Sequence, residues 1–275
     1  MSAPDTITID ADGWVKEAVG VYYQSHTFGP FPSPPKWGCT HGTASPDATA
    51  IDIATNWSRT PADAPNAVST HVLIDKDGTI VQGLSLLNTS WGQSGAANSP
   101  RASFLPAGNL NFFMIGCEHV KYDSIHNSDI LTTEQQKTSF LFWDAVTRFH
   151  HIPREVITIS DCSKGGIIRH KDCDGLNRPF CPGPYPFQEL YDYLHRRYTL
   201  TTEELNTLWS SNIPNLRLGT GLYVEWVKQA QAGNFKGCPS SPEYTLKSPK
   251  TGKATVAQNC GSNTMIWDNG APWWL

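Results

Sequence analysis

The sequence predicts an α/β fold over roughly residues 1–198, and three segments carry that prediction. A hairpin pattern at 66–84, a nearly continuous apolar segment at 109–120 and a helical pattern at 132–151 follow one another along the chain. Interleaved strands and helices are typical of a sheet that helices cover. A chain of 275 residues can also bury a core without needing disulfides or metal in order to fold.

The N-terminal part of the chain predicts several strands after an irregular segment. Residues 1–36 end in FGPFPSPPK, which indicates an irregular segment on the surface. WGCTHGTAS at 37–45 predicts a short strand followed by a turn. NAVSTHVLIDKDGTIVQGL predicts a hairpin, because two alternating segments flank an Asp77-Gly78 turn. NLNFFMIGCEHV predicts a central strand covered on both faces, since it is apolar nearly throughout.

Two helices and a further strand are predicted next. TTEQQKTSFLFWDAVTRFHH has a capping box at its start, formed by Thr132 or Thr133 with a glutamine three residues later. Its apolar face comprises Phe140, Trp143, Val146 and Phe149. Pro153 ends this helix, and EVITIS at 155–160 predicts a strand. A second helix, PFQELYDYLHRRY, is predicted to begin with Pro186 in its first turn.

The pattern changes after residue 198, which predicts a domain boundary near residue 200. Residues 37–198 would form the main domain, with 1–36 as its irregular N-terminal segment and 199–275 as a small C-terminal region. In that region, 201–212 and 222–233 look helical, and the remainder predicts short strands with turns.

The C-terminal region weakly resembles a single copy of short wall-associated repeats, through KGCPSSPEYT and the later tryptophan segment. One interpretation is a wall-binding module in which Trp267, Trp273 and Trp274 stack on glycans. The favoured interpretation is a capping module whose terminal tryptophans dock on the main domain.

Composition excludes several classes of protein. The chain has 21 Lys and Arg against 25 Asp and Glu, a net charge of −4, and no basic run, which argues against a nucleic-acid binder. No apolar segment is long enough to span a membrane. The segment MSAPDTITIDADGW lacks the basic and apolar regions of a signal peptide. We expect a monomer.

The segment IIRHKDCDGLNRPFCPGP contains several candidate metal ligands. A hydrolytic zinc ion needs three protein ligands and one open position, and His170 with Cys181 would supply two of them. His41 is the best third candidate, because it ends a strand in a distant part of the chain. Cys173 ranks below Cys181, since it is only three residues from His170 and lacks the Pro-Gly-Pro anchor. From the residues alone, a packed histidine and a disulfide or buried thiol remain alternatives.

Five motifs resemble those of one enzyme family. CTHGTAS, VSTHVLIDKDGTIVQGL, TSWGQSG, IGCEHV and RHKDCDGLNRPFCPGP occur in the order and spacing of zinc-dependent N-acetylmuramoyl-L-alanine amidases of type 2. This family includes phage amidase lysozymes and peptidoglycan recognition proteins, and the resemblance covers about residues 35–198. It implies a mixed central sheet flanked by helices. It also implies zinc ligands at His41, at His170 and at Cys181, where relatives have Cys or Asp, and a catalytic glutamate at Glu118.

The resemblance implies a peptidoglycan hydrolase that cleaves the amide bond between N-acetylmuramic acid and the L-alanine of the stem peptide. Its substrate would be peptidoglycan or a muropeptide, and Glu118 would be the general base for a zinc-activated water. The enzyme would act outside the cell or at its wall, after removal of a signal or release by lysis. One alternative is a module that binds peptidoglycan on the same fold without cleaving it, and another is a binding protein with a bridged Cys181 and no zinc.

Three positions depart from the family pattern. Pro179 stands where many relatives have a lysine that stabilises the transition state, and we expect the neighbouring Arg178 to act as the catalytic cation. Thr70 stands where some relatives have a catalytic tyrosine. The segment Trp91-Gly92-Gln93 lacks a histidine that contacts substrate in relatives.

Six of the seven cysteines are left once Cys181 is assigned to zinc. Disulfides would indicate an oxidising compartment. The candidate pairs are Cys162 with Cys173, Cys238 with Cys260 and, on strand faces that point apart, Cys39 with Cys117. The alternative is that most of these cysteines are buried free thiols.

Overall fold

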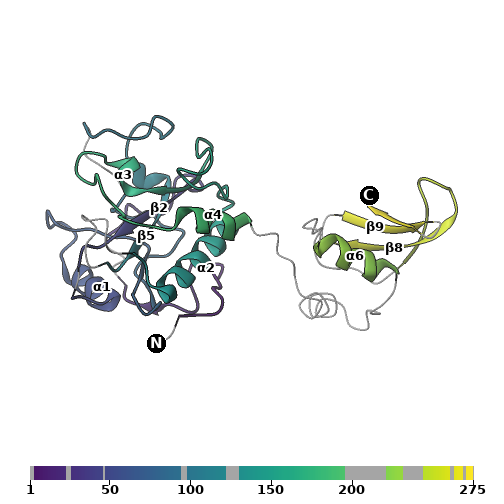
Figure 1. Ribbon diagram of the computed structural model, residues 1–275, viewed down its shortest axis with the longest axis horizontal. Coiled ribbons are helices and arrows are strands. Elements are labelled where there is room, and N and C mark those ends of the chain that lie inside the picture. The colour runs from purple at the N-terminus through teal and green to yellow at the C-terminus, as the bar shows by residue number, and fades with distance from the viewer. Residues whose placement is uncertain are drawn as a thin grey trace. The chain divides into compact units, whose positions relative to one another are not determined.

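A computed structural model describes residues 3–22, 26–45, 47–93, 98–121, 130–195, 221–231, 244–260, 263–268 and 271–274. The chain divides into two compact units, Met1–His195 and Arg196–Leu275 (Figure 1). Each unit is described by itself.

A six-stranded mixed sheet forms the centre of the first unit, in the order β1-β4-β3-β5-β2-β6. The strands are β1 (Val19–Gly20), β2 (Trp37–Gly42), β3 (Val72–Ile74), β4 (Ile80–Gln82), β5 (Met114–His119) and β6 (Gly166–Arg169). β3 and β4 form an antiparallel hairpin, and every other pair of neighbours is parallel. The predicted α/β class, the hairpin and the central strand are therefore confirmed. The central strand starts at Met114, because residues Leu110–Phe112 form the 3-10 turn η1.

Helices cover both faces of this sheet. On one face, α1 (Ala50–Arg59) packs against Leu73 and Val81. On the other face, α2 (Thr133–His150) and α4 (Phe187–His195) pack against Val72 and Ile74. Side chains alternate between the faces of a strand, so neighbouring residues of β3 enter two different cores. The single-turn helix α3 (His170–Cys173) continues directly from β6.

Helix α2 is fixed to the sheet by its cap and by close packing. Thr132 is the N-cap and accepts a hydrogen bond from the Gln135 backbone N–H. The Gln135 side chain does not close the predicted capping box, because it donates to backbone carbonyls at the ends of β3 and β5. Trp143 lies directly over Gly38 of β2, where an added Cβ would come within 2.3 Å of the indole. Only glycine allows this approach, so α2 sits close above the strand that bears His41.

Residues 155–160 were predicted to be a strand, and this prediction is wrong. Val156 makes a single bridge to Ile167, and its carbonyl then accepts from Ile159 N and Ser160 N in a turn. The bridge lies on the outer edge of β6, which is itself the neighbour of β2. The β-branched composition of 155–160 is compatible with a strand, but the turn that follows Val156 ends the pairing with β6 after one bridge.

The helices differ from the prediction in two further respects. Helix α1 was not predicted, although Thr49 and Asp52 form a reciprocal capping box at its start. Helix α4 begins at Phe187, so Pro186 precedes its first residue.

The second unit contains α6 (Gly221–Gln231) and a four-stranded antiparallel sheet in the order β10-β9-β8-β7. Its strands are β7 (Tyr244–Lys247), β8 (Ala254–Cys260), β9 (Asn263–Asp268) and β10 (Ala271–Trp274). The helix predicted at 222–233 and the short strands are confirmed. The helix predicted at 201–212 lies outside the described residues. So do the side chains of the three tryptophans and of the proposed Cys238–Cys260 pair.

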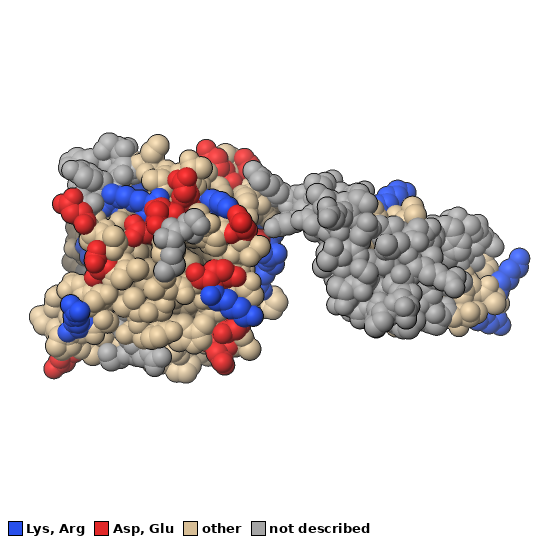
Figure 2. Space-filling model, turned by 90° about the horizontal axis from the view of Figure 1, so that it is seen from below, with Lys and Arg blue, Asp and Glu red and all other residues tan. Residues whose placement is uncertain are grey.

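The surface of the first unit carries charges of both signs. Figure 2 shows basic and acidic side chains interspersed on the face in view. Such mixing gives no extended field of one sign on that face, in keeping with the near balance of charged residues in the sequence. Among the described helices, none has the length and apolar character that crossing a membrane would need.

Candidate metal centre and catalytic cleft

The carboxyl ends of three parallel strands bring the predicted site residues to one place. His41 in β2 lies opposite Glu118 in β5, and β6 leads directly into His170. Residues paired in this way point to the same face of a sheet, here the face that α1 covers. Ligands of open α/β sheets commonly bind beyond such strand ends, and the predicted site residues lie at these ends.

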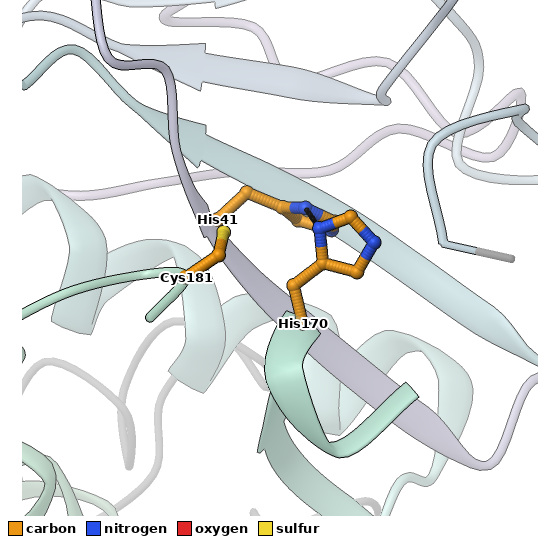
Figure 3. A group of neighbouring side chains, drawn as sticks. All are labelled: His41, His170 and Cys181. Carbon is orange, nitrogen blue, oxygen red and sulfur yellow. Dashed lines mark hydrogen bonds between the residues drawn. The ribbon is translucent and has the colours of Figure 1, made fainter. Parts of the chain in front are cut away.

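His41, His170 and Cys181 point toward one another although they come from β2, α3 and a loop (Figure 3). Each offers one ligand atom, and these three atoms lie within 4.8 Å of one another. The two Nδ1 atoms are 2.9 Å apart, and the Gly42 N–H donates to Cys181 Sγ at 3.5 Å. All three residues are buried, with exposed fractions of 1%, 6% and 7%. The structure therefore brings together the three residues that the sequence singled out as metal ligands.

The two histidines are in the protonation state that a metal ion needs, whereas the cysteine must lose a proton to bind one. Burial lowers the pKa of His170 to about 4 and holds the pKa of His41 well below its usual value, so both imidazoles are neutral at pH 7. Burial also raises the pKa of the Cys181 thiol to about 12. The Nε2 atoms of both histidines are buried and have no hydrogen-bond partner among the described residues. Two nitrogens and one sulfur form a donor set that zinc prefers.

Glu118 lies beside this cluster. Its Oε1 is 3.8 Å from His41 Nδ1, and its Oε2 is buried without a hydrogen-bond partner among the described residues. Burial raises the pKa of Glu118 to about 8, and the positive charge of Arg178 opposes that shift. A carboxyl group with such a pKa can exchange a proton near neutral pH. A cation bound by the neighbouring cluster would favour the ionised form.

A pocket of about 420 Å³ opens in front of the cluster and contains Glu118, His170 and Cys181 among its lining residues. Its walls come from residues 42–45, from α1 and from residues 177–181. Arg178 is exposed, and it is the only Lys or Arg among the described residues that line the pocket. The structure thus places the predicted catalytic cation at the pocket.

Two positions that depart from the family pattern are buried beside the pocket rather than in it. Thr70 and Gln93 are at most 1% exposed, and both pack against Gly116 of β5. Gln93 accepts a hydrogen bond from Ser90 through its side chain and donates one to Asn111 through its backbone N–H. Gln93 is therefore built into the core, and only Gly92 of that motif lines the pocket.

His119 supports the cluster from the other face of β5, and sequence reasoning missed it. Its Nδ1–H donates to the carbonyl of His41 at 2.9 Å, and its Nε2 accepts from the Ser139 hydroxyl at 2.8 Å. Ser139 in turn bonds to the Tyr185 hydroxyl. Burial lowers the pKa of His119 to about 3, which keeps the imidazole neutral and this tautomer possible. The sequence held one signal for its position. Successive side chains of a strand point to opposite faces, so His119 must lie on the face of β5 opposite to Glu118.

All five cysteines whose side chains are described are free and buried: Cys39, Cys117, Cys162, Cys173 and Cys181. The predicted Cys162–Cys173 disulfide is therefore wrong, as is a Cys39–Cys117 pair. Cys173 Sγ lies 3.7 Å from Met114 Sδ and 4.0 Å from Cys39 Sγ, well beyond the 2.05 Å of a disulfide. Cys162 instead lies next to the Ile167 carbonyl. The alternative of buried free thiols holds for these residues.

Comparison with known proteins gives one family match. The family model described as N-acetylmuramoyl-L-alanine amidase matches residues 31–184, which is more than half of the chain. No curated protein matches the sequence. Several solved structures are similar at low identity.

The endolysin N-acetylmuramoyl-L-alanine amidase LysCS from Clostridium intestinale is 20% identical with a TM-score of 0.42, over 66% of this chain and 97% of that chain. AmpD from Citrobacter freundii is 22% identical with a TM-score of 0.42, over 68% of this chain and 95% of that chain. A selenomethionine derivative of AmpD is 21% identical with a TM-score of 0.49, over 68% and 98%.

Proposed function

Since the chain belongs to the N-acetylmuramoyl-L-alanine amidase family, we propose that His41, His170 and Cys181 form the metal centre of a peptidoglycan amidase. As a member of this family, the protein is an amidase hydrolase. The bond cleaved is the amide between the lactyl group of N-acetylmuramic acid and L-alanine. The observation that carries the metal centre is the convergence of three buried ligand atoms within 4.8 Å of one another.

Zinc is the ion that these residues fit best. Two imidazoles and one thiolate are typical zinc ligands, and three protein ligands leave a position open for chemistry. Both histidines are neutral at pH 7, so their nitrogen lone pairs are available without loss of a proton. When bound, the ion would lower the pKa of a coordinated water and polarise the scissile carbonyl.

Glu118 is the proton-transfer residue in this proposal. It lines the same pocket as His170 and Cys181, and its carboxylate lies beside His41. It takes a proton from the attacking water and delivers it to the nitrogen of L-alanine as the amide bond breaks. No other carboxylate is found among the described residues that line the pocket.

Arg178 is the candidate cation for the developing oxyanion. Its positive charge acts on the neighbouring titratable groups, since it lowers the pKa of His170 and opposes the upward shift at Glu118. A cation that lines the pocket stabilises the negative charge that builds up on the carbonyl oxygen. Its exposure makes the contribution smaller than that of a buried donor would be.

The substrate proposed is peptidoglycan or a muropeptide, and the protein acts on it outside the cytoplasm or at the wall, as a monomer. The experiment that tests the reaction uses purified sacculi and measures new amino termini of L-alanine. The wild-type protein with one equivalent of zinc releases them. Glu118→Gln lowers the rate by about 10²- to 10⁴-fold, the range that a general acid–base contributes, and retains its zinc. Glu189→Gln, at an exposed position of α4, is the matched control and keeps the wild-type rate.

Each part of the proposal can fail separately in this experiment. Wild-type protein that binds sacculi without releasing amino termini would favour the recognition module over the enzyme. A protein that binds no zinc would rule out the metal centre. Unchanged release by Glu118→Gln would remove the glutamate from the mechanism while leaving the amidase reaction in place.

A further inference from the structure

Lys121 is a buried lysine two residues after the end of β5, and nothing in the mechanism above uses it. Its exposed fraction is 1%, which is unusual for lysine because burial of a cation is costly. Lys121 lies three residues after Glu118 in the sequence. Lys121 is absent from the residues that line the pocket, so it is not a substitute for the family's active-site lysine.

The backbone of Lys121 is tied to the chain that leaves His41. Its N–H donates to the Thr43 hydroxyl at 3.2 Å, and its carbonyl accepts from Ser45 N at 3.0 Å. The carbonyl of His119 likewise accepts from Thr43 N at 3.0 Å. These contacts extend the pairing of β2 with β5 beyond the strand ends. The position of Lys121 is therefore fixed relative to His41.

The side chain of Lys121 reaches the loop that carries the third proposed ligand. Its Nζ donates to the carbonyl of Pro182 at 3.0 Å and to the carbonyl of Pro184. Pro182 and Pro184 are two of the three residues that immediately follow Cys181. Hydrogen bonds from a charged donor are stronger than those between neutral groups, and they are stronger again where water is excluded.

The backbone of Cys181 is held on its other side by different groups. Its N–H donates to the Arg178 carbonyl at 3.2 Å, and its carbonyl accepts from Lys171 N at 3.1 Å. Those two contacts join the loop to itself and to α3. The Lys121 side chain instead joins it to β5, and thus to the strands that carry His41 and Glu118.

We propose that Lys121 is a positioning residue that holds Cys181 at the distance from His41 that a shared metal ion requires. The inference rests on the proposed metal centre. In it, Lys121 touches neither the metal nor the substrate. Outer-shell partners of this kind typically change metal affinity by about 10- to 100-fold when they are removed. Lys121 acts through backbone carbonyls of the ligand's own loop.

The test measures cobalt binding by Lys121→Met, with Co²⁺ as the probe because a cobalt–thiolate bond has its own near-ultraviolet absorption. We expect the Kd for Co²⁺ to rise about 10- to 100-fold and the thiolate band to weaken. Lys121→Gln keeps amide donors and is expected to lie between this variant and the wild type. Lys164→Met, at an exposed turn, is the matched control and keeps the wild-type Kd and band.

A double-mutant cycle separates positioning from general destabilisation. If Lys121 acts through Cys181, then Lys121→Met raises the Kd little further once Cys181→Ala is present. Equal effects in the two backgrounds would overturn the proposal, and so would an unchanged Kd and band in Lys121→Met. Failure of both Lys121 variants to fold would also overturn it, because the lysine would then serve the fold. Wild-type protein without a thiolate band would instead defeat the metal centre on which this inference rests.

Discussion

The candidate site is supported in two different ways on its two sides. His41 and Glu118 lie in β2 and β5, and each of these strands has a parallel neighbour on both sides. Arg178 and Cys181 belong to residues 174–184, which lie outside the sheet and which we call the 174–184 loop. The strand side is held by backbone pairing, whereas the loop side combines a few backbone hydrogen bonds with contacts from particular side chains.

Side-chain contacts hold the 174–184 loop at both ends. At its start, the buried carboxylate of Asp174 accepts hydrogen bonds from Ser99 and Asn177. At its end, Lys121 donates to two proline carbonyls. Backbone pairing tolerates many side chains, but a loop held in this way depends on each partner. We therefore expect the strand side to fix the chemistry, and the loop side to be where affinity and rate are tuned.

The largest effect is expected on the strand side. His41→Ala removes a proposed ligand from a strand that is paired on both sides, and zinc bound by the other two residues would be held far more weakly. We expect loss of stoichiometric zinc and a fall in amidase rate of at least about 10³-fold. Metal analysis and release of amino termini from sacculi measure both. His195→Ala, at an exposed position of α4, is the control. Full activity without the His41 imidazole would show that the strand side does not fix the chemistry.

The next effect concerns protons on the loop side. Because burial raises the pKa of the Cys181 thiol to about 12, binding of a metal must release that proton, while the histidines release none. The Kd for zinc should therefore fall about tenfold per pH unit, or about 100-fold from pH 6 to pH 8. The measurement is made in the Glu118→Gln background, so that Glu118 contributes no proton.

The matched variant for this prediction is Cys181→Asp, since relatives have either residue at this position. An aspartate is far more acidic than a thiol, so even where burial raises its pKa it loses its proton at a lower pH, and the slope against pH should be shallower than in the wild type. The same slope in both proteins would show that the proton comes from a group other than Cys181.

A smaller effect is expected from the exposed cation of the loop. Arg178→Ala should lower kcat by roughly tenfold, less than the loss of a buried oxyanion donor, because water and salt screen an exposed charge. Zinc content should stay unchanged, and the difference from wild type should shrink as ionic strength rises. Arg59→Ala, at the exposed end of α1, is the control. An effect on zinc content rather than on kcat would make Arg178 part of the loop's support instead.

The strand side of the site was the easier to predict from the sequence. The turn after His41 marked the end of β2, and the apolar segment around Glu118 indicated β5. Both signals depend only on residues that are neighbours in the sequence. The convergence of His41, His170 and Cys181 was expected from the motifs and is what the structure shows. Their role as metal ligands stays a prediction.

The remaining errors concern contacts that the local sequence patterns did not reveal. Residues 155–160 have the composition of a strand, yet they make a single bridge to β6 and then turn. Cys162 and Cys173 bracket His170 in sequence, yet Cys173 turns toward Met114 and Cys39. Lys121 was missed because its partners lie about sixty residues later in the chain. Local patterns carry no information about such partners.

A last effect, on stability rather than on affinity or rate, tests the strand side without any metal. Burial raises the pKa of Glu118 from 4.5 to about 8, so the folded metal-free protein holds a proton there that the unfolded chain loses. The folded state is then the one that binds more protons, and its stability must fall as pH rises from about 4.5 to 8. Below that window both states are protonated and the penalty is absent.

Because 16% of the Glu118 side chain is exposed, solvent screening reduces this penalty, and we expect about 1–2 kcal/mol between pH 4.5 and pH 8. Unfolding of chelator-treated protein by denaturant at a series of pH values measures it, as the difference between wild type and Glu118→Gln. The buried histidines titrate in both proteins, so their contribution cancels in that difference. Glu189→Gln should run parallel to the wild type. A constant difference across this range would mean that Glu118 is already ionised beside an empty cluster, and that the strand side is preorganised in charge as well as in position.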